Sequence, residues 1–221
     1  MNVFDSILTR AHVDPPPDFP RLRIAGRDCG WVAADVLQWL APFAGEIRVD
    51  PGVVHLLPGW DGSGDLPERT AAVNDLLSRI AQALSQAGRL NGWRNELLDV
   101  IADDGTVLGV IERAAVRPLG IATHAVHLNA WTDNGQLWIA QRSFTKTTDP
   151  GMWDTLVGGL ISAGETPESA LLRESWEEAG LLPHHLQSGR RSGQFSVRRI
   201  LPEGYQIEHV TVVDIVLGPE V

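Results

Sequence analysis

The chain has little of several residue types that mark other protein classes. Cys29 is its only cysteine, and Lys146 is its only lysine beside 17 arginines. A single cysteine excludes an intrachain disulfide and favours a reducing compartment. No histidine or basic cluster lies near Cys29 in the sequence, so we expect a buried, small apolar side chain rather than a nucleophile.

The chain also lacks a long apolar run and an excess of positive charge. No uncharged stretch reaches the roughly 20 apolar residues of a membrane span, and the N-terminus has no basic start of a secretion signal. We therefore expect a cytoplasmic protein without a membrane partner. Its formal net charge of -10 repels a phosphate backbone, so nucleic acid is not an expected partner. With 43% hydrophobic and 21% charged residues, the 221-residue chain can form a globular core.

The sequence before Pro118 alternates between strand and helix patterns, and we place a domain boundary near Pro118. Apolar spacing predicts a helix over Asp28–Phe43 and a second one that begins near Pro67. The turn Asp103-Asp104-Gly105 between two apolar runs predicts a hairpin. We therefore predict an N-terminal α+β domain over residues 1–118 and a second domain over residues 119–221. Most of the eight tryptophans lie at apolar positions of these elements and are expected in the core.

A short segment near residue 170 combines helix signals with carboxylates. Thr166 is a good N-cap and Pro167 suits the first helical position, so a helix is predicted over Pro167–Ala179, ending at Gly180. At about 100° per residue, three glutamates share one arc of this helix and an apolar set lies opposite, where we expect packing. The two sets are Glu174, Glu177 and Glu178, and Leu172, Trp176 and Ala179.

The glutamate cluster has two interpretations. Most charge runs are solvated helix faces. Like charges three or four residues apart repel, however, and carboxylates near a helix C-terminus are unfavourable. A divalent cation would reverse this repulsion, and Mg²⁺ or Mn²⁺ prefers hard oxygen ligands such as these.

Gly159, Glu165, Arg173 and Gly180 extend the glutamate cluster into a longer pattern. This pattern resembles the Nudix box of the Nudix hydrolase superfamily. The chain departs from it at Ser175, a packing position where the family usually carries an aliphatic residue. The matching positions are Gly159, Glu165, Arg173, Glu174, Glu177, Glu178, Gly180 and Leu181.

The resemblance implies a fold, a metal and a reaction. The fold would be an α/β/α sandwich with a mixed sheet, and so of the α+β class. Glu177 and Glu178 would be the principal ligands of Mg²⁺ or Mn²⁺, and the Gly159 carbonyl would complete the shell. Glu174 would bind the metal or orient the attacking water, so Glu174 and Glu178 are the expected catalytic residues. Glu165 would pair with Arg173 in a structural role. The implied activity is hydrolysis of a phosphoanhydride bond in a small diphosphate-containing substrate.

The stretch before the box suggests substrate contacts. Arg142 and Lys146 follow a predicted strand and are interpreted as phosphate contacts rather than ordinary loop charges. Trp153 lies beside them and is the tryptophan that we assign to substrate binding. Together with two segments near residues 93–98 and 111–121, this stretch is similar to a Nudix subgroup with an uncharacterised N-terminal domain, and to the Nudix part of fungal thiamine pyrophosphokinase fusions. That similarity implies thiamine diphosphate or a damaged analogue as substrate.

Two function classes remain open at this stage, and a third ranks last. The intact glutamate triplet favours a hydrolase. The Nudix fold usually continues with a second flanking helix after the strands expected here, so the domain is expected to be C-terminally incomplete or completed by a partner subunit, for example in a homodimer. An incomplete domain favours the alternative, a non-catalytic ligand-binding or regulatory module. An isomerase of the same superfamily ranks last, because it would need a cysteine near the site and Cys29 lies in the other domain.

Overall fold

The computed structural model describes residues 11–60, 66–145 and 150–218. These residues divide into two compact units. Unit 1 contains the chain up to Thr123 and the segment Ser196–Glu208, and unit 2 contains His124–Phe195 and the chain from His209 onwards. The predicted boundary at residue 118 falls before this division. Leu119 and Ile121 are both buried, so the chain does not leave the unit 1 core at Pro118.

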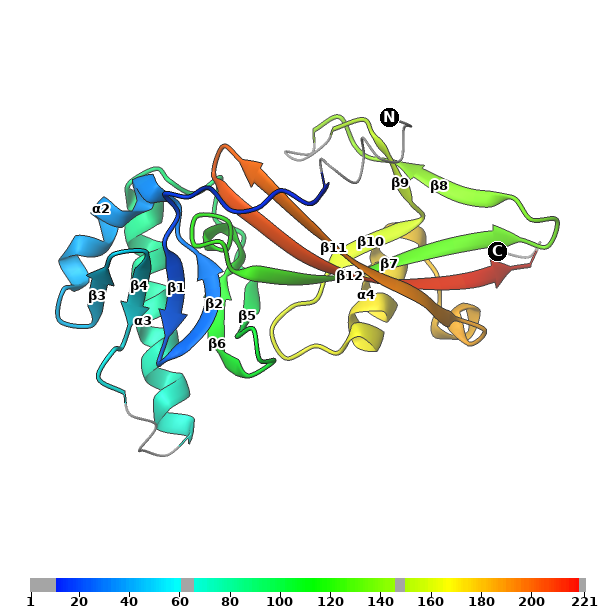
Figure 1. The fold of residues 1–221 in the computed structure, drawn as a ribbon. Coiled ribbons are helices and arrows are strands. Elements are labelled where there is room, and N and C mark those ends of the chain that lie inside the picture. Colours follow the sequence, from blue (N-terminus) through cyan, green and yellow to red (C-terminus); the bar gives the residue numbers. More distant parts are fainter. Residues whose placement is uncertain (1–10, 61–65, 146–149, 219–221) are drawn as a thin grey trace. The chain divides into compact units, whose positions relative to one another are not determined.

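Unit 1 is built around a four-stranded sheet in the order β2-β1-β4-β3 (Figure 1). Strand β1 pairs antiparallel with β2 and parallel with β4, and β3 pairs antiparallel with β4. Helix α3 (Leu66–Gln86) reaches the turn between β1 and β2, where its Arg69 donates to the Ala25 carbonyl at 3.2 Å. The strands are β1 (Arg21–Ile24), β2 (Arg27–Trp31), β3 (Ile47–Asp50) and β4 (Val53–Leu56).

The predicted helix over Asp28–Phe43 is wrong in its first part, which is strand β2. The reason is a close backbone approach that the helical pattern does not reveal. A side chain at Gly30 would overlap with the carbonyl groups of Leu119 and Gly120, and the Trp31 amide donates to the Leu119 carbonyl at 3.1 Å. Only short helical segments follow the strand: η1 (Ala34–Val36), α2 (Leu37–Leu40) and η2 (Ala41–Phe43).

The second predicted helix and the predicted hairpin are confirmed. Helix α3 spans Leu66–Gln86, and its apolar stripe packs against β6. Strands β5 (Leu97–Ile101) and β6 (Val107–Glu112) form the hairpin, followed by the short helix η3 (Arg113–Ala115). The fully buried residues of α3 are Leu76, Leu77, Ile80, Ala81 and Leu84.

Cys29 is a buried side chain of unit 1, as predicted. It is 2% exposed, and its burial raises the pKa of the thiol to about 12. The thiolate is therefore strongly disfavoured near neutral pH. Unit 1 also buries Tyr205, whose hydroxyl donates to the Val13 carbonyl at 2.6 Å.

Unit 2 is organised on a six-stranded sheet to which unit 1 also contributes residues, because β7, β11 and β12 each extend into both units. The strand order is β11-β12-β7-β8-β9, and β10 also pairs with β7. The strands are β7 (Ala122–Thr132), β8 (Leu137–Gln141), β9 (Trp153–Thr155), β10 (Val157–Leu160), β11 (Arg190–Leu201) and β12 (Gly204–Leu217).

Helix α4 (Pro167–Ala179) packs against β10 and closes the core of unit 2. A short helix, η4 (Pro183–Leu186), follows it. The core combines β7, β10, α4 and β12, which gives the sheet-and-helix packing of an α+β unit. Its buried residues are Val126, Leu128, Ala130, Val157, Ala170, Leu171, Leu181, Ile215 and Leu217. The predicted α+β fold class is confirmed.

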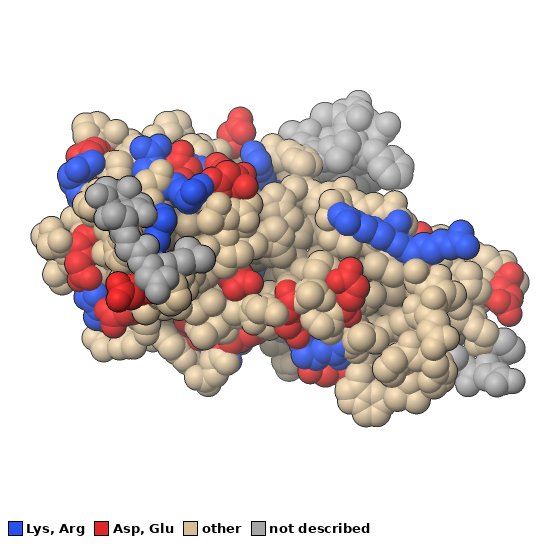
Figure 2. Space-filling model, turned by 90° about the horizontal axis from the view of Figure 1, so that it is seen from below, with Lys and Arg blue, Asp and Glu red and all other residues tan. Residues whose placement is uncertain are grey.

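Two features of the structure bear on the expectation that neither a membrane nor nucleic acid is a partner. No helix in the described part of the chain is long and apolar enough to cross a membrane. On the face drawn in Figure 2, acidic and basic side chains are mixed over one part, and basic side chains form a row over another.

The prediction that most tryptophans are core residues is wrong, because none of the eight is buried. Six are exposed: Trp39, Trp93, Trp131, Trp138, Trp153 and Trp176.

Candidate functional site

Helix α4 begins and ends where its caps predict. The Thr166 hydroxyl accepts from the Ser169 amide at 3.2 Å, and the Thr166 amide donates to the Ser169 hydroxyl at 2.9 Å. At the other end, Gly180 adopts a left-handed conformation with φ of 66° and donates to helix carbonyls. These caps fix the ends of the helix and therefore the positions of its glutamates.

The predicted packing face of α4 is wrong for two of its three residues. Leu172 and Trp176 are 40% and 60% exposed, whereas Ala179 packs against the core, as predicted, and Ala170, Leu171 and Ser175 are buried. The prediction placed the glutamates on one side of the helix and all packing contacts on the opposite side. The helix instead turns part of its acidic side toward β10, where Glu174 has a side-chain exposure of only 14%.

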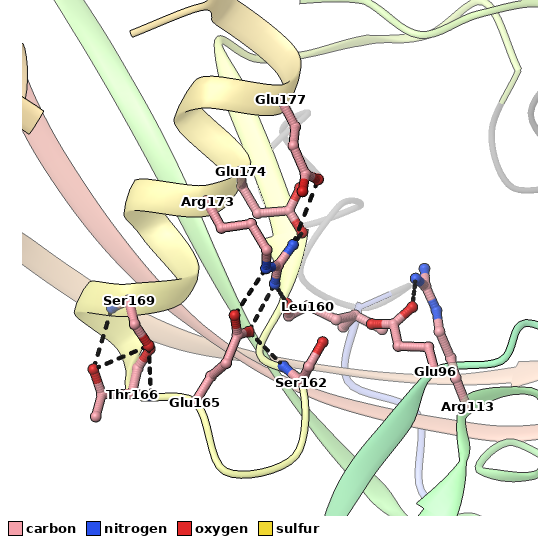
Figure 3. Close-up of polar contacts among 10 residues, drawn as sticks. All are labelled: Glu96, Arg113, Leu160, Ser162, Glu165, Thr166, Ser169, Arg173, Glu174 and Glu177. Atoms are coloured by element: carbon pink, nitrogen blue, oxygen red, sulfur yellow. Dashed lines mark hydrogen bonds and ion pairs between the residues drawn. The ribbon is translucent and has the colours of Figure 1, made fainter. Parts of the chain in front are cut away.

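An arginine on α4 ties the helix to the loop that precedes it (Figure 3). Arg173 donates Nε and Nη2 to the two carboxylate oxygens of Glu165, at 2.8 and 2.7 Å, and Nη2 also donates to the Leu160 carbonyl at 3.1 Å. Glu165 accepts in addition from the Ser162 amide at 2.9 Å. The Arg173 guanidinium holds the pKa of Glu165 below its ordinary value. The predicted pairing is therefore present, and it braces the loop between β10 and α4.

The remaining donor of Arg173 reaches the glutamate cluster. Its Nη1 donates to Glu174 at 2.6 Å and lies 3.7 Å from the Glu177 carboxylate (Figure 3). The third glutamate, Glu178, accepts from the Gly158 backbone amide at 3.0 Å. The contact of α4 with β10 thus places the carboxylates of Glu174 and Glu178 beside the backbone of that strand, and Arg173 links Glu174 to Glu177.

Gly159 provides the space that this arrangement needs. A Cβ atom at this position would overlap with the Glu174 carboxylate, so only glycine allows the close approach. In β10, Gly159 is the register partner of Val126 in β7. Gly159, Glu174 and Glu178 are therefore brought together at the contact of β10 with α4.

The electrostatic environment of Glu174 indicates that the carboxylates interact. Burial raises its pKa above the ordinary glutamate value, and the neighbouring charges of Glu178 and Glu177 act in the same direction, against the hydrogen bond from Arg173. Partial burial and like charge both disfavour the ionised form. A divalent cation bound nearby would remove both penalties.

The oxygen atoms gathered here are of the kind that a hard divalent cation prefers. The structure does not, however, arrange them around a metal position. Carboxylate and carbonyl oxygens are the ligands that Mg²⁺ and Mn²⁺ prefer. Within residues 11–60, 66–145 and 150–218, however, no group of three or more His, Cys, Asp or Glu side chains is arranged to hold a metal. In this structure Arg173 and the Gly158 amide already occupy oxygens of Glu174 and Glu178.

A second polar group surrounds β9, and only its member Arg142 was identified from the sequence. Arg142 donates to Asp154 at 2.8 Å, and the Thr155 hydroxyl lies 3.2 Å from Nδ1 of His127. Burial opposes ionisation of Asp154, but the Arg142 hydrogen bond and the positive charges nearby hold its pKa below the ordinary value. A Cβ atom at Gly158 would lie 3.2 Å from the His127 ring, so this group adjoins β10. Only the pairing of β8 with β9 and of β7 with β10 reveals these neighbours.

The predicted substrate contacts have different outcomes. Arg142 is held in place by Asp154. Trp153 is 65% exposed and precedes Asp154 on β9, so the alternation along a strand directs it to the other face. The structure therefore does not bring Trp153 to the Arg142–Asp154 pair. Lys146 lies outside the described residues.

Two known domain families match adjoining parts of the chain. The NUDIX domain matches residues 122–215, and a domain of unknown function, DUF4743, matches residues 10–123. The second match covers more than half of the chain.

Curated proteins and solved structures resemble the chain over part of its length. Nudix hydrolase 20 of Arabidopsis thaliana, described as chloroplastic, is 39% identical over 118 residues, which are 52% of this chain and 30% of that protein. Isopentenyl-diphosphate Delta-isomerase of Streptomyces avermitilis is 33% identical over 106 residues, 47% of this chain and 54% of that enzyme. The crystal structure of DR0079 from Deinococcus radiodurans is 29% identical, with a TM-score of 0.40, over 53% of this chain and 72% of that one. The chain spans at most about half the length of these curated relatives.

Proposed function

The chain belongs to the Nudix superfamily and carries the DUF4743 domain before its Nudix domain, and on this basis we propose that it hydrolyses a phosphoanhydride bond of a small diphosphate compound. The observation that supports this most directly is the contact of β10 with α4. It gathers Gly159, Glu174 and Glu178 at one place, with Arg173 anchored by Glu165.

The proposed reaction is attack of water on a phosphorus atom. The bridging P–O bond breaks, the water oxygen forms the new P–O bond, and two phosphorylated or phosphate products leave. Glu174 is assigned to orienting the attacking water, because Arg173 and the Gly159 backbone fix the position of its carboxylate. Arg142, held by Asp154, is assigned to a phosphate oxygen of the substrate.

Mg²⁺ or Mn²⁺ is the proposed cofactor. Glu177, Glu178 and the Gly159 carbonyl would hold it, with Glu174 as a further oxygen ligand. Such an ion neutralises the charge of the diphosphate and activates water. Thiamine diphosphate is the first substrate to test, because of the sequence similarity to the Nudix part of fungal thiamine pyrophosphokinase fusions. A cytoplasmic location and a homodimer stay predictions.

A non-catalytic binding module is the second proposal, and one observation favours it. Arg173 and the Gly158 amide already pair with the carboxylates of Glu174 and Glu178. These contacts would have to be shared or exchanged before a cation binds. A regulatory module that binds a diphosphate ligand without hydrolysing it does not need a cation positioned to activate water.

Product release distinguishes the two proposals. The purified chain is incubated with thiamine diphosphate, nucleoside diphosphates linked to other groups, and dinucleotides, with and without Mg²⁺ or Mn²⁺. The hydrolase proposal expects metal-dependent release from at least one compound. Calorimetric binding of a diphosphate compound without release from any of them would support the binding module instead.

Substitution within α4 then tests the site. Glu178→Gln should lower kcat/KM by about a hundredfold or more, because it removes a negatively charged ligand of the proposed cation. Its melting temperature should stay close to that of the wild type. Glu168→Gln, an exposed glutamate in the first turn of the same helix, is the matched control and should keep full activity. Equal activities of the two variants would contradict the assignment of Glu178.

A further inference from the structure

The first half of strand β11 forms an open edge of the sheet in unit 2. Among the strands of the described residues, β11 stands at one end of the strand order and pairs with β12 alone (Figure 1). Every residue of the segment Arg190–Phe195 is exposed. Such an edge presents backbone N–H and C=O groups to solvent, where another strand can pair with them.

The second half of β11 shows that this side of the strand accepts another backbone. His12 forms a parallel bridge with Arg198, and the Val13 amide donates to the Arg198 carbonyl at 3.0 Å. Arg198 therefore directs its backbone groups away from β12. This direction alternates along an antiparallel strand, so Ser192 and Gln194 direct their backbone N–H and C=O groups to the same open side.

Arginines without a carboxylate partner distinguish this strand. Most arginines that the structure describes form ion pairs, as Arg79 does with Glu46. Arg190, Arg191 and Arg198 form no ion pair with a carboxylate of the described residues. Strand β11 itself contains no acidic residue. It is therefore a cationic strip in a chain whose formal net charge is -10.

The open edge also carries an exposed aromatic side chain. Phe195 is 48% exposed and lies four positions after Arg191, so the two side chains share one face of the strand. Side chains on paired strands contact one another across the ladder. A strand that paired with this edge would therefore cover part of Phe195 and place its own side chains beside Arg191.

The charge of the edge determines which kind of strand it can accept. Two copies of β11 that paired edge to edge would bring the arginines of both copies onto one ladder, and like charges opposite each other destabilise a sheet. The same arginines attract glutamate and aspartate side chains. Nucleic acid also carries negative charge, but it cannot pair with a row of backbone N–H and C=O groups, and the net charge of the chain repels it.

We propose that the segment Arg190–Phe195 binds an extended, acidic segment of a partner protein. The partner adds a strand to the sheet by pairing its backbone with the outward groups of Ser192 and Gln194. Its carboxylates contact Arg190 and Arg191, and an apolar residue of the partner covers Phe195. The surface lies on β11, whereas the glutamates of α4 lie beside β10, so the inference does not depend on the proposed hydrolysis.

Binding of a defined peptide tests the proposal. A short fluorescein-labelled peptide of alternating glutamate and valine is titrated with the intact chain, and its fluorescence anisotropy is measured. A peptide with lysine in place of glutamate is the matched control. The proposal expects saturable binding of the acidic peptide and none of the lysine peptide. Oligothymidylate and vesicles that contain phosphatidylserine are then added as competitors at equal charge concentration.

Two results of this titration would overturn the proposal. The first is the absence of saturable binding of the acidic peptide. The second is displacement of the labelled peptide by oligothymidylate or by the vesicles as effectively as by the unlabelled acidic peptide, which would mean that the arginines bind any polyanion.

Arginine variants test the contribution of charge. The double variant Arg190→Gln/Arg191→Gln should weaken binding of the acidic peptide about tenfold or more, because two charged contacts are lost. Arg48→Gln is the matched control, since it removes an exposed arginine from β3 in unit 1, and it should keep the affinity of the wild type.

A proline variant tests the backbone contacts. Ser192→Pro removes an outward N–H, and an edge strand tolerates proline where its N–H faces solvent. Ser192→Pro should therefore keep the fold, checked by circular dichroism, and should weaken peptide binding. Ser192→Ala keeps the N–H and should bind as the wild type does. Wild-type affinity in Ser192→Pro or in the double arginine variant would overturn the proposal.

Discussion

The two units differ in where they place their large apolar side chains. Most of the large, fully buried side chains in the described part of the chain belong to unit 1, among them Leu76, Leu119 and Tyr205. Most of the exposed large hydrophobics belong to unit 2, including Trp138, Trp153 and Trp176. Burial of apolar area stabilises a fold by about 25 cal/mol per Å². Unit 1 therefore has the stronger apolar core.

The candidate Nudix site lies in the unit with the weaker apolar core. Unit 2 brings together the mutually repelling carboxylates of Glu174, Glu177 and Glu178, and relies on the polar brace of Arg173 and Glu165. Sites that bind or react commonly hold groups that are unfavourable for stability alone. The comparison indicates that unit 1 has most to lose from the removal of apolar groups, and unit 2 from the loss of polar contacts.

Truncation of one leucine in each unit tests the first half of this comparison. Leu76→Ala in α3 removes a fully buried side chain and should lower the free energy of unfolding by about 2–5 kcal/mol. Leu172→Ala makes the same chemical change in α4, where the side chain is 40% exposed, and should cost roughly 0.5 kcal/mol. Urea unfolding followed by circular dichroism measures both. Equal losses would show that unit 2 depends on apolar packing as much as unit 1.

Removal of the Glu165 charge tests whether unit 2 depends on its polar contacts. Glu165→Gln should destabilise the protein by about 1–2 kcal/mol at neutral pH, because Arg173 loses a bidentate ionic partner. The fold lowers the pKa of Glu165, so this stabilisation is complete above its ordinary pKa of about 4.3 and is lost as the pH falls through the lower value in the fold. The wild type and the variant should therefore converge in acid.

Urea unfolding at several pH values makes this measurement. Glu168→Gln, an exposed change on the same helix, provides the control and should cost at most a few tenths of a kcal/mol. A difference between the wild type and Glu165→Gln that stays constant from neutral to acid pH would rule out the ionic origin.

Residues at the two ends of α4 were sufficient to predict its bounds, but they did not predict which side of the helix packs. Thr166, Pro167 and Gly180 act within one turn of the helix ends, so the bounds of α4 are readable from neighbouring residues. Which side of the helix packs is decided by β10, where Gly159 admits the Glu174 carboxylate. That contact forms between segments whose register the sequence does not reveal.

Contacts between distant segments also explain why β2 was predicted as helix and why the partner of Arg142 was missed. The pattern from Asp28 to Phe43 is locally helical, but strand pairing and the approach of Leu119 to Gly30 override it in the first residues. Asp154 was missed as the partner of Arg142, because their contact depends on the antiparallel pairing of β8 with β9. Predictions based on adjacent residues succeed for α3 and α4, and they fail where strand pairing overrides the local pattern.

Two serines on α4 give the finest test of how unit 2 balances polar groups. Ser175 is fully buried and its hydroxyl has no hydrogen-bond partner among the residues that the structure describes, at the position where the family usually carries an aliphatic residue. Ser175→Ala should raise the free energy of unfolding by about 1 kcal/mol, because it removes an unsatisfied buried hydroxyl and favours the helix. Ser169→Ala should lower it by a similar amount, about 0.5–1 kcal/mol, because the Ser169 hydroxyl accepts from the Thr166 amide. Urea unfolding of the two variants should show opposite signs. A loss of stability in Ser175→Ala would mean that this hydroxyl has a partner in solution and that the core of unit 2 includes a polar contact at this position.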